Sequence, residues 1–401
     1  MIKGNNINYN EINNNLFEYF RRLKHKGLDP DVILGSPKLR ALIYDKNKII
    51  RRIKASFWRR LFTYFGKRVI FLFEPFKKDY YHIKAICLYL MAKIELDTFD
   101  KDEEGEELLK ILDSFRIPGT YLFSYPFPPH YYGEGYSINS QFSVILSFVA
   151  ELFFKLYNKY TEEKYLIYFK NVVEAIVNTI PIHIKNNDEI CFYYDNVSRY
   201  FVHNANLLVV EMITKYNYLF NEHDRFNEFN SLIEKGLNYS LNDYKRTSSY
   251  YYSGEETRNK SIDNYHTGYV LRSINEINKY RNNKLQVGNL IIEINKLLEY
   301  YIRTFVKTGF YIYKWKLETI EAHSLAESIL VYSLFYNKID EKTRKFYLKK
   351  INRTIKILYK DKKFVNSITT CIGIPIISDN LDYIRWAQAW MLYALSNLIH
   401  K

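Results

Sequence analysis

The stretch YYYSGEETRNKSIDNYHTGYVL, residues 250–271, joins a polar and aromatic loop to the beginning of a helix. Gly254 gives the loop conformational freedom, and apolar residues recur at helical spacing from about Ile262 onward. Tyrosine rings stack on sugar rings, whereas carboxylate, amide and imidazole groups bind hydroxyls or transfer protons. The stretch therefore indicates a helical protein with a sugar site in its interhelical loops. The alternative is a polar loop whose aromatic side chains only cover the core.

The same helical spacing of apolar residues continues along most of the chain. Short polar breaks such as FDKDEEGEE and NKIDEKTR separate the helices, which pair into antiparallel hairpins. We expect an all-α (α/α)6 toroid over residues 81–401, with residues 1–80 as a basic helical extension packed on it or leading into it. The eleven expected helices are at residues 82–97, 104–115, 137–158, 162–180, 203–219, 226–241, 264–281, 287–305, 321–337, 341–359 and 382–399, and a twelfth is expected near 36–66.

The net charge of +14 is unevenly distributed. Residues 1–80 contain 18 Lys or Arg against 7 Asp or Glu, so this segment supplies +11 of the total. Within it, residues 36–80 mix cations with Ile, Phe and Trp, a pattern typical of a surface that meets anionic lipid or a polyanionic glycan. No nucleic-acid-binding motif accompanies it, so we expect no nucleic-acid partner. A solvated basic helix packed on the domain is the alternative.

The cysteine pattern and the N-terminus indicate an intracellular protein. Cys87, Cys191 and Cys371 are far apart and form no CxxC pair, which argues against a disulfide framework and a structural zinc site. The start MIKGNNINYN has no apolar signal region. We expect a cytoplasmic protein, peripheral at the inner face of the membrane if the basic segment binds lipid, and we expect neither a cofactor nor a metal.

The longer loops, 116–136, 183–202, 243–263, 306–320 and 360–381, fall between successive hairpins, so in a toroid they would converge at one end. Candidate site residues lie in or beside them. The catalytic candidates are His203, His266, Glu255, Asp263 and Glu321. The substrate-binding candidates are Tyr131, Tyr132, Glu134, Gln141, Tyr194, Asn204, Tyr252, Arg258, Asn264, Trp315, His323, Arg385, Trp386 and Gln388.

Two groups of these candidate residues share one sequence pattern. VHNANLL (residues 202–208) and IDNYHTGY (residues 262–269) each place a His near an Asn at the beginning of an apolar helix. Such a His could position a sugar or remove a proton from it. Equally, the polar residues could cap the helix, with the His hydrogen-bonded in the first turn.

These strings, together with YPFPPHYYGEGYSINSQFSVILSFVAELFFKLYNKYTEEKYL and IRWAQAWMLYAL, resemble a family found in polysaccharide-biosynthesis gene neighbourhoods, with a six-hairpin glycosidase-like toroid. The resemblance covers about residues 116–399. More remotely, the chain is similar to heparinase-type lyases and glucuronyl C5-epimerases, which use Tyr, His, Asn and Arg. The resemblance implies a fold and a pathway more strongly than a reaction. This chain has Tyr and Phe in the 121–132 loop, where the family has at least one Trp.

The sequence leaves three functions open, each with a free or lipid-linked poly- or oligosaccharide as the partner. In a uronate lyase or C5-epimerase, Asn204 or Arg385 would neutralise the substrate carboxylate while His203, His266 or a tyrosine removes the C5 proton. In a glycoside hydrolase, the second function, two carboxylates would act as acid and base or nucleophile, chosen from Glu134, Asp195, Glu255, Glu256, Asp263 and Glu321. The third function is a non-catalytic glycan-binding scaffold of a membrane-associated assembly.

Overall fold

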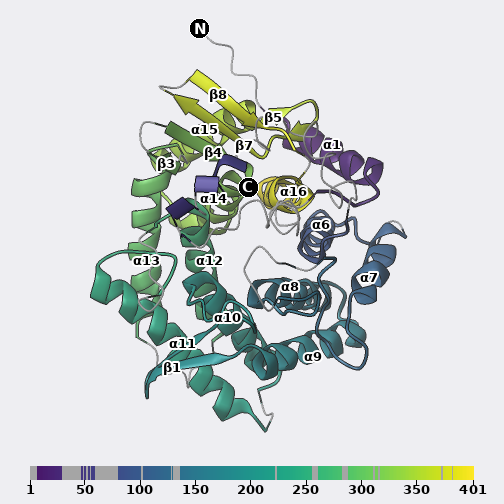
Figure 1. Ribbon diagram of the computed structural model, residues 1–401, viewed down its shortest axis with the longest axis vertical. Coiled ribbons are helices and arrows are strands. Elements are labelled where there is room, and N and C mark those ends of the chain that lie inside the picture. Colours follow the sequence, from purple (N-terminus) through teal and green to yellow (C-terminus); the bar gives the residue numbers. More distant parts are fainter. Residues whose placement is uncertain are drawn as a thin grey trace. The chain divides into compact units, whose positions relative to one another are not determined.

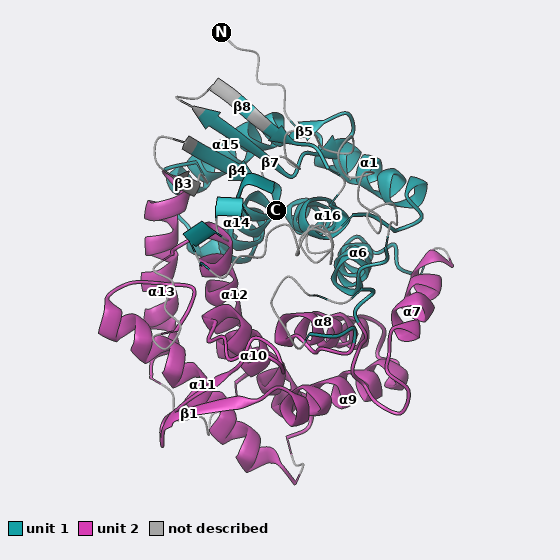
Figure 2. Cartoon of the chain, viewed as in Figure 1, with its two compact units in different colours: residues 1–102, 125–138, 308–401 teal, residues 103–124, 139–307 magenta. Residues whose placement is uncertain are grey.

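The chain divides into two compact units, neither of which is continuous in sequence (Figures 1 and 2). Unit 1 contains residues 1–102, 125–138 and 308–401, and unit 2 contains residues 103–124 and 139–307. The boundary expected at residue 80 is not one of the boundaries between these units. The computed structural model describes residues 7–28, 47, 49–50, 53–54, 56–58, 80–100, 103–127, 129, 136–221, 224–254, 261–281, 288–309, 312–314, 317–371, 374–381 and 383–401.

Unit 2 contains two layers of helices. In one layer α10 packs between α8 and α12, and in the other α9, α11 and α13 each pack against one of these three (Figure 1). The elements of unit 2 are α7 (Glu104–Ser114), α8 (Ser143–Tyr160), α9 (Glu163–Thr179), β1 (Ile182–Asn186), β2 (Glu189–Phe192), α10 (His203–Leu219), α11 (Phe226–Thr247), α12 (Asn264–Tyr280), α13 (Leu290–Tyr301) and a π-helical turn (Ile302–Val306).

The apolar patterns explain this layering. Helix α10 is buried from His203 to Asn217, as expected for a helix with neighbours on several sides. Helix α9 instead buries one stripe, in which Phe169, Val172 and Ile176 recur three and four residues apart. Helices α10 and α11 approach closely at Gly236, where an added Cβ would lie 2.5 Å from a methyl group of Val210.

The β1–β2 hairpin is antiparallel, with Ile182 opposite Phe192, and β2 packs on α11. It lies at the beginning of the expected loop 183–202, where no strand was predicted. The residues of β2 are all buried, so β2 is part of the core of unit 2, whereas β1 is partly exposed.

Unit 1 is also built on packed helices. Helix α16 packs against both α6 and α14, while α15 packs on α14 and α1 packs on α16. Four strands form an antiparallel sheet in the order β3-β4-β7-β8, and β5 pairs with β6. The elements are α1 (Tyr9–Arg22), α6 (Ile83–Glu95), β3 (Ile312–Lys314), β4 (Leu317–Glu321), α14 (Ala322–Phe335), a 3-10 turn (Tyr336–Lys338), α15 (Glu341–Leu358), β5 (Tyr359–Lys360), β6 (Lys363–Phe364), β7 (Ser367–Cys371), β8 (Ile374–Asp379), a π-helical turn (Ile384–Gln388) and α16 (Ala389–Leu398).

Each of the eleven helices predicted from residue 82 onward is present, most of them within a few residues of the expected bounds. Helix α1 was not predicted, and neither were the strands in the loops 306–320 and 360–381. Most of the helix expected near 36–66 lies outside the described residues. Among the described residues, no helix combines the length and the apolar character needed to cross a membrane.

Candidate functional site

The beginning of α12 contains a carboxylate–imidazole pair. Asp263 is the N-cap, and one of its oxygens accepts the backbone N–H of His266 at 2.8 Å. Its other oxygen contacts Nδ1 of the same His266 at 2.6 Å. The cap therefore does two things, because it satisfies a free N–H of the first helical turn and holds the imidazole in one orientation.

This arrangement leaves the other ring nitrogen for chemistry. A carboxylate only accepts hydrogen bonds, so Nδ1 of His266 donates to Asp263 and Nε2 of the neutral ring carries the lone pair. The His266 side chain is 18% exposed, and within the described ranges Nε2 makes no hydrogen bond. A partly exposed imidazole whose Nδ1 is held by a carboxylate, with Nε2 unengaged, is the arrangement expected of a general base.

Two tyrosine rings contact the His266 imidazole. Tyr252 is stacked on it, with ring centroids 4.6 Å apart and planes at 15°, and the Tyr265 centroid lies at 4.0 Å. Tyr252 was a predicted site residue, whereas Tyr265 was missed. The only signal for Tyr265 was its position next to His266 in the sequence.

Asn204 lies in the first turn of α10, which packs against α12. It is 5% exposed, and its Oδ1 is buried without a hydrogen bond to any residue in the described part of the chain. A buried amide oxygen without a partner is unfavourable by about 1–3 kcal/mol. A ligand that donates a hydrogen bond to this oxygen would remove that penalty, and the role of Asn204 in substrate binding stays a prediction.

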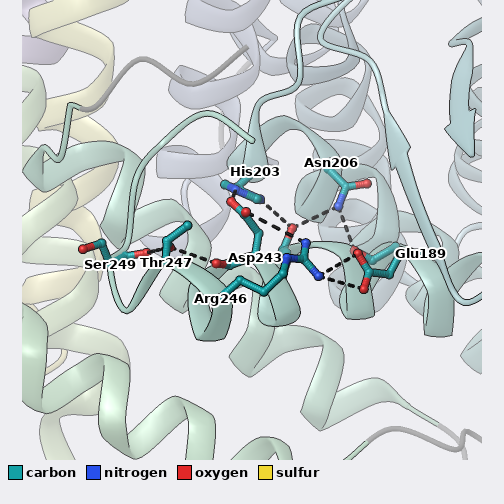
Figure 3. Close-up of polar contacts among 9 residues, drawn as sticks. Glu189, His203, Asn206, Asp243, Arg246, Thr247 and Ser249 are labelled. Atoms are coloured by element: carbon teal, nitrogen blue, oxygen red, sulfur yellow. Dashed lines mark hydrogen bonds and ion pairs between the residues drawn. The ribbon is translucent and has the colours of Figure 1, made fainter. Parts of the chain in front are cut away.

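His203 is different, and its geometry corrects the expected catalytic role. The ring is 0% exposed, and its nitrogens contact the Ser240 hydroxyl at 3.0 Å and the Asp243 carboxylate at 2.9 Å (Figure 3). Neither nitrogen is left for a sugar, so His203 is a buried structural group that joins α10 to α11.

Gln141 and Asn264 also have their amides engaged inside unit 2. Gln141 accepts the Phe123 N–H at 3.2 Å and donates to the Phe123 carbonyl at 3.1 Å, so it braces the preceding loop. Asn264 is buried and accepts a hydrogen bond from the Tyr301 hydroxyl. These contacts replace the sugar-binding roles that we expected for both amides.

Two further residues of unit 2 were expected near the site. Asp195 is fully buried and accepts the backbone N–H groups of Val197 and Ser198, so it caps its own turn. The Tyr194 ring is half-buried and packs edge-to-face on Phe142. Tyr194 is therefore partly accessible, whereas both oxygens of Asp195 are engaged, since the second oxygen accepts the Ser198 hydroxyl at 2.8 Å.

In unit 1, Glu321 and His323 stand at the beginning of α14. Glu321 is the last residue of β4 and the N-cap position of the helix, and it is partly exposed. His323 stacks on Trp390 of α16 with ring centroids 4.8 Å apart. Both side chains therefore lie at the start of a buried helix, as the sequence predicted.

The π-helical turn before α16 carries three further candidates. Arg385 is buried and donates to the Tyr125 hydroxyl at 3.0 Å, and its guanidinium lies 5.5 Å from the centre of the Trp386 ring. Trp386 is 37% exposed. Gln388 is fully buried and brackets Phe364 by bonding to both its N–H (3.0 Å) and its carbonyl (2.6 Å). These two hydrogen bonds give Gln388 a structural role, whereas substrate binding was expected.

The remaining candidates lie outside the described residues: Tyr131, Tyr132, Glu134, Glu255, Glu256, Arg258 and Trp315. Within the described ranges, no three His, Cys, Asp or Glu side chains are grouped so that they could hold a metal ion.

A buried charge cluster joins α8, α10 and α12 away from their N-terminal turns. Lys215 lies 2.6 Å from both Glu151 and Glu211, and Glu276 is 3.6 Å away. Burial acts to lower the pKa of Lys215, but these carboxylates outweigh it and raise the pKa. Burial also raises the pKa of Glu211, against the opposing effect of Lys215.

No protein-family model matches the chain, and no curated protein matches its sequence. Solved structures match it in fold. A cellobiose 2-epimerase from Bacillus thermoamylovorans is 12% identical with a TM-score of 0.58, over 80% of this chain and 88% of that one. A family 76 α-mannanase from Bacteroides thetaiotaomicron is 11% identical with a TM-score of 0.56, over 79% and 86%.

The Lin0763 protein from Listeria innocua matches nearly the full length, over 98% of this chain and 97% of that one, with 11% identity and a TM-score of 0.55. The epimerase and the mannanase have (α/α)6 toroids of the six-hairpin glycosidase-like type. The expected fold is therefore confirmed: this chain is an all-α (α/α)6 toroid.

Proposed function

We propose that the protein is a carbohydrate-modifying enzyme that removes a proton from a sugar carbon, with His266 as the general base. The observation that carries the proposal is the Asp263–His266 pair, in which the His266 side chain is partly exposed and Nε2 makes no hydrogen bond within the described ranges. Asp263 would orient the ring and stabilise the imidazolium that forms when the proton is taken.

A uronate is the substrate class that this chemistry favours. The carboxylate on C5 makes the C5 proton more acidic, and an amide or guanidinium that binds the carboxylate would stabilise the negative charge that develops when the proton leaves. The unpaired Oδ1 of Asn204 would accept a hydrogen bond from a sugar hydroxyl, which supports a role of this residue in holding the sugar, whereas the carboxylate, itself an acceptor, would need an N–H donor of an amide or a guanidinium.

Two outcomes follow once His266 holds the C5 proton. In elimination, the C5–H electron pair forms a C4=C5 double bond and the C4–O bond breaks, so the departing oxygen takes up a proton. In epimerisation, a proton is delivered to C5 from the opposite face and no bond of the sugar backbone breaks. The free Nε2 serves either reaction, and the source of the second proton decides between them.

The proposal extends to the biological setting predicted from the sequence. The glycan would be a surface or extracellular polysaccharide or its lipid-linked precursor. The basic segment 36–80 would then hold the protein at the anionic inner face of the membrane. The net charge of that segment and the resemblance of residues 116–399 support this setting.

Hydrolysis is a second candidate, favoured by the similarity to a family 76 α-mannanase. It requires two available carboxylates. Of the described candidates, Asp195 and Asp263 are engaged by neighbouring groups, while Glu321 is partly exposed. Proton abstraction therefore ranks first.

Incubation with defined uronate-containing and neutral oligosaccharides tests the reaction class. Ultraviolet absorbance would report elimination, hydrogen exchange at C5 would report epimerisation, and new reducing ends without either signal would report hydrolysis. We expect one of the first two signals with a uronate substrate. Glycan binding without any turnover would identify a scaffold and contradict the proposal.

A further inference from the structure

A buried polar network contacts the segment that carries Tyr252. On α11, Asp243 contacts His203 at 2.9 Å and Arg246 at 3.9 Å, and Arg246 in turn contacts Glu189 of β2 at 2.9 Å (Figure 3). The chain of contacts therefore joins the β1–β2 hairpin, α11 and the first turn of α10. Asp243 is 1% exposed.

The hydrogen bonds define the orientation of the His203 ring. Nε2 donates to Asp243, because a carboxylate only accepts. Nδ1 then accepts from the Ser240 hydroxyl at 3.0 Å, and Ser240 itself accepts from the Asn206 amide at 3.1 Å. Every polar atom of the neutral imidazole is satisfied, so the first turn of α10 is held in one position against α11.

The backbone of this first turn holds the Tyr252 segment. The His203 N–H donates to the Tyr252 carbonyl at 3.0 Å, and the Gly254 N–H donates to the Phe201 carbonyl at 2.8 Å. Gly254 fits closely as well, since an added Cβ would lie 2.1 Å from the Tyr239 hydroxyl. The glycine is therefore required for space rather than for the conformational freedom that the sequence suggested.

We propose that His203 and Asp243 are positioning residues, which hold Tyr252 flat against the His266 imidazole. The order of contacts is Asp243 to the His203 ring, the His203 N–H to the Tyr252 carbonyl, and the Tyr252 ring to His266, at 4.6 Å and 15°. The catalytic consequence rests on the proposed function of His266, whereas the positioning itself does not.

Nuclear magnetic resonance of the histidine rings tests the positioning without a substrate. In the full chain labelled at histidine, the His266 ring protons lie over the face of Tyr252 and resonate upfield. His266→Gln assigns the signal, and Tyr252→Leu gives its position without the stacked ring. We expect Asp243→Asn to move the signal from its wild-type position toward that of Tyr252→Leu.

Asn217→Ala is the matched control. Asn217 is equally buried in the same α10–α11 interface, where its amide donates to Asn230 at 2.9 Å, but it lies near the far end of α10. It should lower stability and leave the His266 signal in place. Ser240→Ala is a milder second variant, which removes the hydrogen bonds of the Ser240 hydroxyl to Nδ1 and to the Asn206 amide but keeps the Asp243 contact, and it should move the signal in the same direction.

A His266 signal that keeps its wild-type position in both Asp243→Asn and Ser240→Ala would overturn the positioning role. So would an equal movement in Asn217→Ala, since that would reflect general loosening. Failure of the proposed function is a separate result, because it would appear as turnover that survives His266→Gln while the resonances behave as described.

Discussion

The first turns of α10 and α12 carry the same kind of histidine in two opposite settings. His203 is fully buried, and both of its ring nitrogens are engaged by Ser240 and Asp243 of the neighbouring helix. His266 is partly exposed, and one nitrogen is engaged by Asp263 of its own helix cap. The two histidines therefore differ in how many ring nitrogens are engaged rather than in their place on a helix, and we propose chemistry only for His266.

The largest expected difference between the two histidines concerns turnover. Loss of a general base lowers rates by roughly 10²–10⁴-fold, so His266→Gln should lower kcat by that factor. The folded state should remain, because the side chain is partly exposed. The measurement is kcat on the substrate found in the oligosaccharide assay, with His400→Gln, an exposed histidine, as the control. An unchanged kcat in His266→Gln would remove the base from the account.

For stability we expect the opposite order, with a larger loss for a substitution of His203 than for one of His266. His203→Ala leaves the buried Asp243 carboxylate without its main partner and opens a cavity, which should lower the free energy of unfolding by about 3 kcal/mol. His266→Ala should cost about 1 kcal/mol or less, because its pair is partly exposed. Urea unfolding measures both. Equal losses would show that the two settings do not differ as described.

The buried carboxylates around Lys215 should make the free energy of unfolding depend on pH. Burial raises the pKa of Glu211 in the folded state, while Lys215 opposes the rise. Between the pKa of an unfolded glutamate, about 4.3, and this raised value, the folded state binds more protons than the unfolded state. The free energy of unfolding should therefore fall as pH rises through that window, by up to about 1.4 kcal/mol per pH unit.

The difference in unfolding free energy between wild type and Glu211→Gln isolates this contribution. Glu276→Gln is the matched control of opposite sign. Burial acts to raise the pKa of Glu276, but Lys215 and other nearby cations lower it overall. Its stabilisation should be present above about pH 4.3 and be lost as pH falls through the lowered value. A Glu211→Gln difference that does not vary with pH would contradict the assignment.

The smallest expected effect concerns two neighbours on the turn before α16. Trp386 is exposed, so Trp386→Ala should raise KM about fivefold, for a stacking contact of about 1 kcal/mol, and leave stability unchanged. Gln388→Ala should instead lower stability, because Gln388 brackets Phe364. Steady-state kinetics and urea unfolding on both variants separate the two roles. A fall in stability without a KM change in Trp386→Ala would assign the indole to the core.

The helices were predictable because each has a local apolar signal. The bounds of α10 match the prediction because VHNANLL leads directly into a long apolar segment. The strands β7 and β8 were missed, since their short Ile- and Thr-containing segments show too few residues to distinguish a strand from a loop. Helix α1 was missed because its apolar residues are spread among many Asn side chains.

The geometry of the candidate site was predictable only where its contacts are local. Asp263 and His266 are three residues apart, so a cap and a pair could be inferred together. The burial of His203 depends on Ser240 and Asp243, which come about 40 residues later in the chain. Gln141 and Gln388 were assigned to sugar because each lies near the beginning of an expected helix, next to one of the longer loops. In the fold, backbone groups engage both.

Release of deuterium into water from a uronate oligosaccharide labelled at C5 shows directly whether the protein removes the C5 proton. Both elimination and epimerisation require this release, whereas hydrolysis does not. Wild-type protein and His400→Gln should release the label, and His266→Gln should release it roughly 10²–10⁴-fold more slowly. Release at the wild-type rate from His266→Gln, or turnover with the label retained, would contradict the account.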